Sequence, residues 1–166
     1  MNEIKPLKRS FQLQPLSREH HDGLLFVWKI RQGLQNNTGM ETLQQFTHWY
    51  CKQHISPHFY QEEKILLPFF SPSDPLAVKM KEDHDYIREL ILSIEQEPDR
   101  DDFTRLTNLI DAHIRFEERE FFQYLEENLS EQELTEVYEK LEKHPVACKE
   151  EWKNIFWLKK EPGNGK

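Results

Sequence analysis

The sequence predicts an all-α protein: a four-helix bundle with an extra C-terminal helical segment. The first observation is that apolar residues recur at three- and four-residue spacing over four long stretches. The second is that only five glycines occur in 166 residues, which implies few tight turns. The third is a composition of 37% hydrophobic and 31% charged residues, which suits a soluble protein built from amphipathic helices.

Residues 1–16 predict an extended lead-in, and the bundle itself is expected to span residues 17–128. Ser17 is the expected N-cap of the first helix, which should reach about Gln35. The apolar positions that we expect to face the core in this helix are Leu24, Leu25 and Trp28.

The second helix is expected over residues 41–70 and contains a proline. Pro57 removes one backbone hydrogen bond and clashes with the carbonyl four residues earlier, so we expect a kink or a break there. A loop rich in proline and serine follows at residues 71–75. The last two helices of the bundle are expected at residues 76–95 and 101–127.

Residues 129–160 predict a C-terminal helical extension, and residues 161–166 a flexible tail. Ser130 and Glu133 form a capping-box pattern that opens the extension. Pro145 is expected to divide it in two. An aromatic group in its second part should pack back on the bundle or else offer a surface to a partner: Trp152, Phe156 and Trp157.

Composition and charge also limit the classes of partner and the cellular location that we expect. The net charge of -8 argues against nucleic acid, because binding to phosphates needs a cationic surface. No run of about 18 apolar residues predicts a membrane helix, and Met1–Pro15 lacks the apolar core of a signal peptide. Cys51 and Cys148 make no disulfide framework; each is expected to be a buried or half-buried apolar residue. We therefore expect a cytoplasmic protein without a membrane partner, and leave a homo-oligomer open.

Two stretches share the pattern H-x-x-x-E-E, His58–Glu63 and His113–Glu118. Residues four apart in a helix lie above one another on the same face. Each stretch therefore points one imidazole and one carboxylate at the same place. Two such helices facing each other would offer the ligands that a pair of first-row transition metals prefers.

The other two helices of the bundle each add a histidine. A lone histidine on an apolar face is more often a core residue with a satisfied hydrogen bond, and one H-x-x-x-E pattern arises easily by chance in a chain rich in both residues. The joint pattern is stronger, because burying so many polar groups without a metal costs about 1–3 kcal/mol each. The predicted metal ligands are His21, His58, Glu62, His84, His113 and Glu117.

Two neighbouring histidines compete with this choice. His20 and His21 cannot both face the core, and His21 is preferred because it shares the face of Leu24; His20 is the alternative. His54 lies one turn before His58 and is expected not to be a ligand.

Three further charged residues lie close to the predicted ligands in the sequence. Glu63 and Glu118 are expected to face solvent or to support the ligands. Arg88 is expected to pair with a carboxylate.

These motifs resemble the hemerythrin-like family of HHE cation-binding domains over about residues 17–128. The resemblance implies an up-down-up-down four-helix bundle around a non-haem di-iron centre. Oxygen-carrying members have an extra histidine where this chain has Arg88, and an aspartate five residues after the last histidine, whereas Glu117 lies four after His113. The ligand set looks more like that of di-iron proteins implicated in repairing damaged iron centres, in which both glutamates bridge. The segments that carry the resemblance are Arg18–Asp22, His58–Glu63, Glu82–Asp85 and His113–Glu118.

The expected cofactor is therefore two non-haem iron ions, with manganese or zinc as alternatives that the ligand types also allow. The expected partner is a small diatomic ligand such as O2 or NO. Three functions stay open: a protein that binds or senses such a ligand or handles iron, a di-iron enzyme or iron donor in the repair of oxidative or nitrosative damage, and a metal-free interaction protein. Whether the chain is an enzyme is left undecided.

Overall fold

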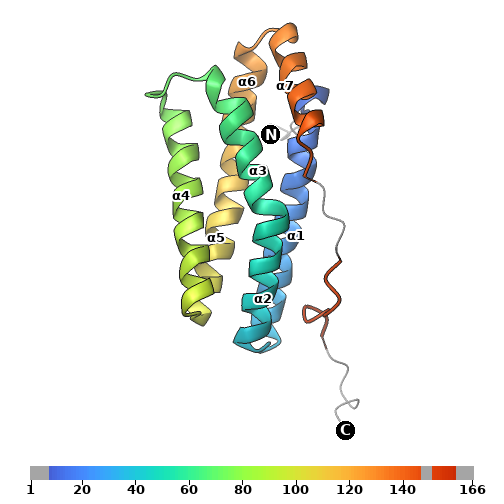
Figure 1. Ribbon diagram of the computed structural model, residues 1–166, viewed down its shortest axis with the longest axis vertical. Coiled ribbons are helices and arrows are strands. Elements are labelled where there is room, and N and C mark those ends of the chain that lie inside the picture. Colours follow the sequence, from blue (N-terminus) through green and yellow to red (C-terminus); the bar gives the residue numbers. More distant parts are fainter. Residues whose placement is uncertain (1–7, 147–150, 160–166) are drawn as a thin grey trace, which may run out of the picture.

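The computed structural model describes residues 8–146 and 151–159. Within these ranges all regular secondary structure is helical, and four long helical arms form a bundle (Figure 1). The prediction of an all-α bundle is confirmed. The predicted tail at 161–166, most of the predicted lead-in's first half and Cys148 lie outside the described residues.

The first arm begins earlier than predicted. A short 3₁₀ turn, η1 (Phe11–Leu13), leads directly into α1 (Gln14–Gln35), so Ser17 is not the N-cap. Pro15 lies in the first turn of α1, where its missing N–H is not needed. The arm ends as its turn chemistry suggests, with Asn37 in the left-handed region at φ 56°.

The second arm is one helical path with two π-helical turns in it. It runs through α2 (Met40–Tyr50), the π turn η2 (Cys51–Ile55), α3 (Ser56–Gln61), the π turn η3 (Glu62–Leu66) and the 3₁₀ turn η4 (Leu67–Phe69). Pro57 does not break it. The π turn just before Pro57 widens the backbone ladder, which accommodates the residue that cannot donate.

The third arm is α4 (Pro75–Gln96), and the fourth consists of α5 (Arg100–Phe116), the π turn η5 (Glu117–Phe121) and α6 (Phe122–Asn128). The side chains of Asp74 and Asp99 cap α4 and α5 by accepting a backbone N–H. The π turns η3 and η5 begin at Glu62 and Glu117. Such turns occur frequently at functional sites.

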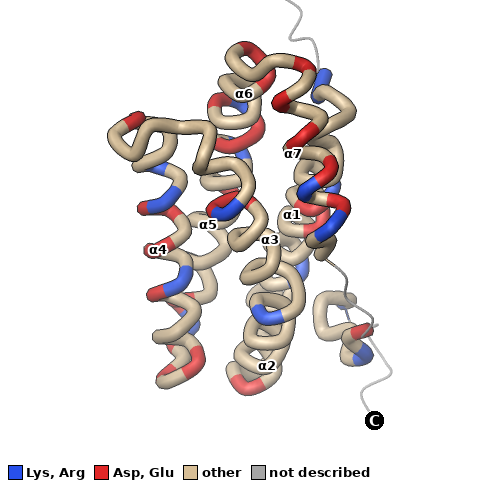
Figure 2. The backbone as a smooth tube through the Cα atoms, turned by 45° about the horizontal axis from the view of Figure 1, so that its top comes forward, with Lys and Arg blue, Asp and Glu red and all other residues tan. Residues whose placement is uncertain are grey.

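The C-terminal extension is only half helical. The Ser130–Glu133 capping box is present and opens α7 (Glu131–Lys143), which lies beside the upper end of α1 (Figure 2). Residues 151–159 contain turns and bends but no helix, so the expected second helical part is wrong for the described residues. The aromatic group nevertheless packs back on the bundle, as the first of the two alternatives expected: Trp152, Phe156 and Trp157.

The core consists of two apolar clusters at the two ends of the bundle. The cluster near α6 and α7 includes Leu16, Leu66 and Phe121. The cluster near the turn between α1 and α2 includes Phe26 and Phe46, and the C-terminal aromatic group packs against it. Along every arm the predicted ligand positions lie between residues of the two clusters. The fold therefore holds a polar layer between two apolar halves. Among the described residues, no helix is both long and apolar enough to cross a bilayer.

Candidate metal centre

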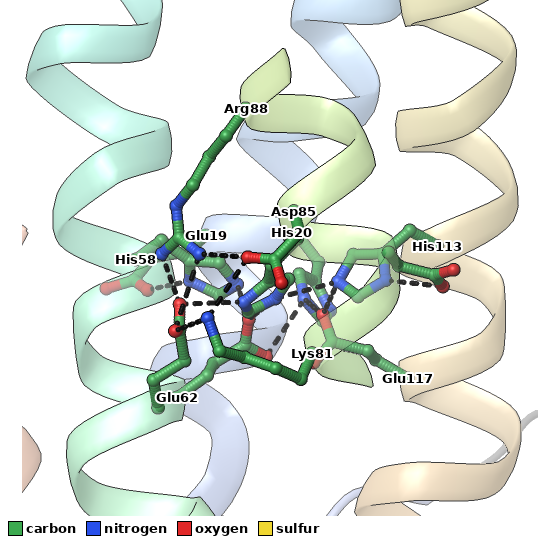
Figure 3. A network of polar contacts seen from close by, with 12 residues as sticks. Glu19, His20, His58, Glu62, Lys81, Asp85, Arg88, His113 and Glu117 are labelled. Carbon is green, nitrogen blue, oxygen red and sulfur yellow. Dashed lines mark hydrogen bonds and ion pairs between the residues drawn. The ribbon is translucent and has the colours of Figure 1, made fainter. Parts of the chain in front are cut away.

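Each helical arm places one histidine in the polar layer (Figure 3). The four are nearly inaccessible, with 0% to 8% of their surface exposed, and the two glutamates among them are fully buried. Charged and polar groups are rarely buried to this degree unless they are paired or bind a metal. The six residues are His20, His58, Glu62, His84, His113 and Glu117.

The histidine from α1 is His20, and the preference for His21 is wrong. His21 is exposed, whereas His20 is 3% exposed and faces the other imidazoles. The inward face of α1 carries Gly23 and Val27, one residue out of phase with the predicted face. An inward glycine adds no hydrophobicity to the pattern, and a shift of one residue turns a helix face by about 100°.

The six side chains form two overlapping groups that share both carboxylates. In each group the four candidate ligand atoms lie within 4.8 Å of one another. Two ligands on opposite sides of one ion, each about 2.0–2.2 Å from it, lie about 4.4 Å apart at most, so a shift of a few tenths of an ångström would let one ion contact all four atoms of a group. The first group is His20, His58, Glu62 and Glu117, and the second is Glu62, His84, His113 and Glu117.

The imidazole Nε2 atoms point at the carboxylates. His58 Nε2 lies 3.1 Å and His84 Nε2 lies 3.2 Å from the same oxygen of Glu62, Oε1. His113 Nε2 lies 2.7 Å and His20 Nε2 lies 3.2 Å from Oε1 of Glu117. Each carboxylate is thus approached by one imidazole from each group, as a bridging ligand would be.

Several of these buried atoms have no hydrogen-bond partner among the described residues. They include both carboxylate oxygens of Glu62, Oε2 of Glu117 and Nε2 of His58. An unsatisfied buried polar group costs about 1–3 kcal/mol, and more when it is charged. A cation at each group would satisfy these atoms, so the residues present fit a metal centre.

An outer layer of carboxylates fixes the orientation of all four imidazoles. Each Nδ1 lies at hydrogen-bond distance from one carboxylate oxygen, which leaves Nε2 free to face the centre. The four Nδ1–oxygen distances are 2.5 Å for His58 with Glu19, 2.9 Å for His20 with Glu118, 3.1 Å for His84 with Glu63, and 3.0 Å for His113 with Asp83.

Each of the four outer carboxylates stands directly next to one of the six site residues in the sequence. Glu19 and Asp83 directly precede the histidines of α1 and α4, and each binds the histidine of the next arm. Glu63 and Glu118 directly follow the buried glutamates, and they bind the remaining two histidines. The supporting role expected for Glu63 and Glu118 is therefore what the contacts show. Glu19 and Asp83 were missed, although their place beside a histidine in two corresponding helices could have indicated them.

Lysine and arginine side chains pair with three of the four outer carboxylates. Arg88 pairs with Glu63, as expected of it, and Lys81 reaches the same carboxylate at 3.0 Å. Lys79 lies 3.0 Å from Asp83. On the opposite side Arg9 pairs with Glu118 at 3.1 Å.

The buried groups titrate as a coupled set. Burial, followed by the charge of Glu117, raises the pKa of Glu62 to about 8. Burial acts in the same direction on Glu117, but the positive charge of His113, whose Nε2 lies 2.7 Å from the carboxylate, holds the pKa of Glu117 well below its usual range. Burial opposes a charge on His113, yet the charge of Glu117 and the hydrogen bond to Asp83 raise the pKa of His113 to about 10. Near neutral pH, Glu62 and His113 therefore keep their protons, which allows the buried carboxylates and imidazoles to stay in contact. A metal ion would have to displace these protons.

A small cavity of about 40 Å³ adjoins the first group. Its wall includes the ligand candidates His20, His58 and His113. His54 also lies in the wall and belongs to neither group of candidate ligands; that it is not a ligand stays a prediction. Most of the remaining wall is aliphatic or aromatic: Gly23, Tyr50, Ile55, Phe59, Ile87, Ile110, Ile114 and Val146.

Comparison with known proteins agrees with this geometry. Residues 13–125 match the family model of the hemerythrin HHE cation-binding domain. Searches among curated proteins and among solved structures gave no match. The matched segment covers more than half of the chain and contains all six residues of the two groups, while α7 and residues 151–159 lie beyond it. The chain belongs to the hemerythrin HHE cation-binding domain family.

Proposed function

We propose that the protein holds two non-haem iron ions and reversibly binds a small uncharged ligand such as O2 or NO. One ion would be held by His20 and His58, and the other by His84 and His113. Glu62 and Glu117 would bridge them. The observation that carries this proposal is the convergence of four Nε2 atoms on two buried carboxylates whose oxygens lack other partners.

Iron is the metal that we propose because imidazole and carboxylate ligands suit it, as they also suit manganese and zinc. Two divalent ions carry four positive charges, and the two bridging carboxylates remove two of them. The outer carboxylates lower the remaining charge further through the imidazoles that they bind. The chain therefore offers a nearly neutral environment for two ions inside the bundle.

The cavity supports a small, uncharged ligand. About 40 Å³ holds one or two molecules of the size of water, whose share of liquid volume is about 30 Å³. Its largely apolar wall favours a neutral diatomic molecule, because an anion that entered it would lose its hydration and would need the charge of a bound metal cation in return. Bound iron would supply an open coordination position and electrons for such a ligand.

The chain's own residues would perform three tasks. The outer carboxylates hold each imidazole with Nε2 inward, so the geometry is set before a ligand arrives. The apolar wall formed by Ile55, Ile110 and Ile114 keeps bulk water from the ligand position. Glu62, whose pKa is raised to about 8, would release its proton to solvent on metal loading and would then be able to hold both ions with its carboxylate.

Metal analysis with element identification tests the first part of the proposal. Protein purified without added iron should contain about two equivalents of iron per chain. A variant with both His58→Ala and Glu117→Ala should lose this metal, and a His21→Ala variant should keep it, because His21 is exposed. Unchanged metal in the double variant would show that the assignment of the site is wrong.

Spectra of the reduced protein test the second part. Adding and then removing O2 or NO should produce a change that reverses, with the metal content constant. Steady consumption of the ligand would instead favour the enzyme alternative. Release of iron during the cycle would favour the iron-donor alternative.

A further inference from the structure

The segment 151–159, which we call the strap, runs along the lower half of the bundle after α7 (Figure 1). It has no helix or strand of its own, so its place depends on side chains. Trp152, Phe156 and Trp157 contact Phe46 of α2, with ring centroids 5.3, 5.0 and 5.8 Å away. The strap lies beyond the matched family domain, which ends at residue 125.

The C-terminal end of α1 forms a binding position for the strap, which we call its seat. The ring of Phe156 lies against Gly33 of α1 so closely that a Cβ at that position would be 2.7 Å from it. The side-chain amide of Asn36 donates to the carbonyl oxygens of Phe156 and Trp157, at 3.2 and 3.3 Å. The ammonium of Lys29 lies 4.2 Å from the centroid of the Trp157 ring.

A second hollow lies between the strap and the bundle, with a volume of about 360 Å³. Four strap residues form one side of it: Glu151, Trp152, Ile155 and Trp157. Asp22, Tyr50 and His54 belong to its wall and also to the wall of the inner cavity beside the candidate metal groups. The two spaces therefore meet at these three residues.

We propose that the strap is a gate on the route by which small ligands reach the candidate metal centre. The route enters the hollow beneath the strap, passes Tyr50 and His54, and ends in the inner cavity next to His20 and His58. This inference rests on the proposed function, since it names how the ligand of that same site enters. It adds a role for a part of the chain that the family match does not include.

The way the strap is held suits a gate. It is docked by aromatic contacts and by two hydrogen bonds from one side chain, whereas a helix in the bundle is held by a continuous backbone ladder. Segments with few buried contacts open locally at a small fraction of the free energy of global unfolding. Ile155 and Leu158 of the strap are 52% and 58% exposed, so only one side of the strap has to leave the bundle.

The test compares two strap variants. Phe156→Ala removes the ring that occupies the seat at Gly33 and should release the strap. Leu158→Ala changes an exposed strap residue and serves as the matched control. In the metal-loaded protein, azide should associate about tenfold faster with the Phe156→Ala variant than with the unchanged chain, and at an unchanged rate with the control.

A readout without metal separates this proposal from the proposed function. In the metal-free protein, xenon should exchange faster with the inner cavity when Phe156 is replaced, as measured by NMR. Limited proteolysis at Lys153 reports whether the strap has left the bundle. If the single change leaves the strap docked, the variant with both Trp152→Ala and Phe156→Ala takes its place.

Azide and xenon rates that stay unchanged while proteolysis shows a released strap would overturn the gate. A protein that binds no metal but shows faster xenon exchange would overturn the proposed function and leave the gate standing.

Discussion

The two halves of the candidate centre have matching ligands and different surroundings. The imidazole of His84, in one half, stacks on the ring of Phe59 with centroids 3.7 Å apart. In the other half, His20 stacks on Phe122 at 5.1 Å. The wall of the inner cavity includes both histidines of the first half, His20 and His58, but only His113 of the second half. The ring of Phe59 covers His84, so the first half faces the cavity with both of its imidazoles and the second half with one.

The outer carboxylates differ in the same sense. Asp83, which binds His113, is held by Lys79. Its counterpart Glu19, which binds His58, makes no ion pair with a lysine or arginine among the described residues, and it lines the cavity. A repeated motif can therefore supply a symmetric set of ligands, while the residues around it decide which half a ligand can reach.

The largest expected effect is a difference in metal content between a variant of a carboxylate that both groups share and a variant of a histidine that belongs to one group. Glu62 belongs to both groups and His20 to one. Glu62→Gln should therefore lose both metal ions, whereas His20→Ala should keep about one, held in the group of His84 and His113. Metal content per chain after gel filtration measures the difference.

A control on the metal-free fold keeps this comparison clear. Because the pKa of Glu62 is raised to about 8, the carboxyl is largely protonated near neutral pH without metal, and the neutral amide in Glu62→Gln should leave the metal-free fold intact by circular dichroism. An equal loss of metal in both variants would contradict the idea that the carboxylates bridge two separate positions.

The next effect is the dependence of metal binding on pH. The pKa of Glu62 is raised to about 8 and that of His113 to about 10, so between pH 6 and 8 an entering cation displaces protons. The apparent affinity should rise about tenfold per pH unit for each proton displaced. Titration calorimetry in buffers of different ionisation enthalpy counts these protons.

The stability of the metal-free protein should fall as the pH rises, whereas the metal affinity should rise. A raised pKa in the folded state means that His113 stabilises the fold fully below about pH 6.5 and loses this contribution as the pH rises towards 10. Glu62 acts in the same direction, since its contribution is complete below about pH 4.5 and is lost as the pH rises towards 8. The melting temperature without metal should fall from pH 6.5 to 9. A constant or rising value would show that these groups do not titrate as described.

A smaller effect compares the outer carboxylates of the two halves. Glu19→Gln and Asp83→Asn each weaken the support of one imidazole, and such changes typically reduce metal affinity about 10- to 100-fold. Only the change at Glu19 alters the cavity wall, so it alone should also alter the rate of azide binding. Competition with a chelator gives the affinities, and equal azide rates in the two variants would remove the functional difference between the halves.

The fold could be predicted largely because its signals are local and repeated. The apolar spacing, the capping box at Ser130 and the turn after Gln35 each act within a few residues. The π turns that begin at Glu62 and Glu117 could not be predicted, since they depend on how the arms pack. The strap could not be placed either, because its seat at Gly33 is formed by residues far from it in the sequence.

The structure brings five of the six predicted ligands together in the polar layer, and the sixth, His21, lies outside it for a local reason. Leu24, Leu25 and Trp28 suggested a face that includes His21, but Leu25 and Trp28 are 44% and 45% exposed. The buried face runs through Leu16, His20, Gly23, Val27 and Ile30 at alternating spacings of four and three. That regular spacing was present in the sequence, and the glycine in its middle concealed it.

The smallest expected effect concerns that glycine. Gly23 lies three residues after His20, and the corresponding residue after His84 is Ile87; both line the inner cavity. A Cβ at Gly23 would lie 2.9 Å from Cδ1 of Ile114 on α5, so Gly23→Ala must push a flexible side-chain end aside. Overpacking costs about 1–3 kcal/mol, and removing a helical glycine returns about 0.5–1 kcal/mol. We expect a net loss of about 1 kcal/mol in the free energy of unfolding, measured with denaturant, and slower azide binding with unchanged metal content. A more stable variant with an unchanged azide rate would mean that Gly23 does not keep this half of the centre open.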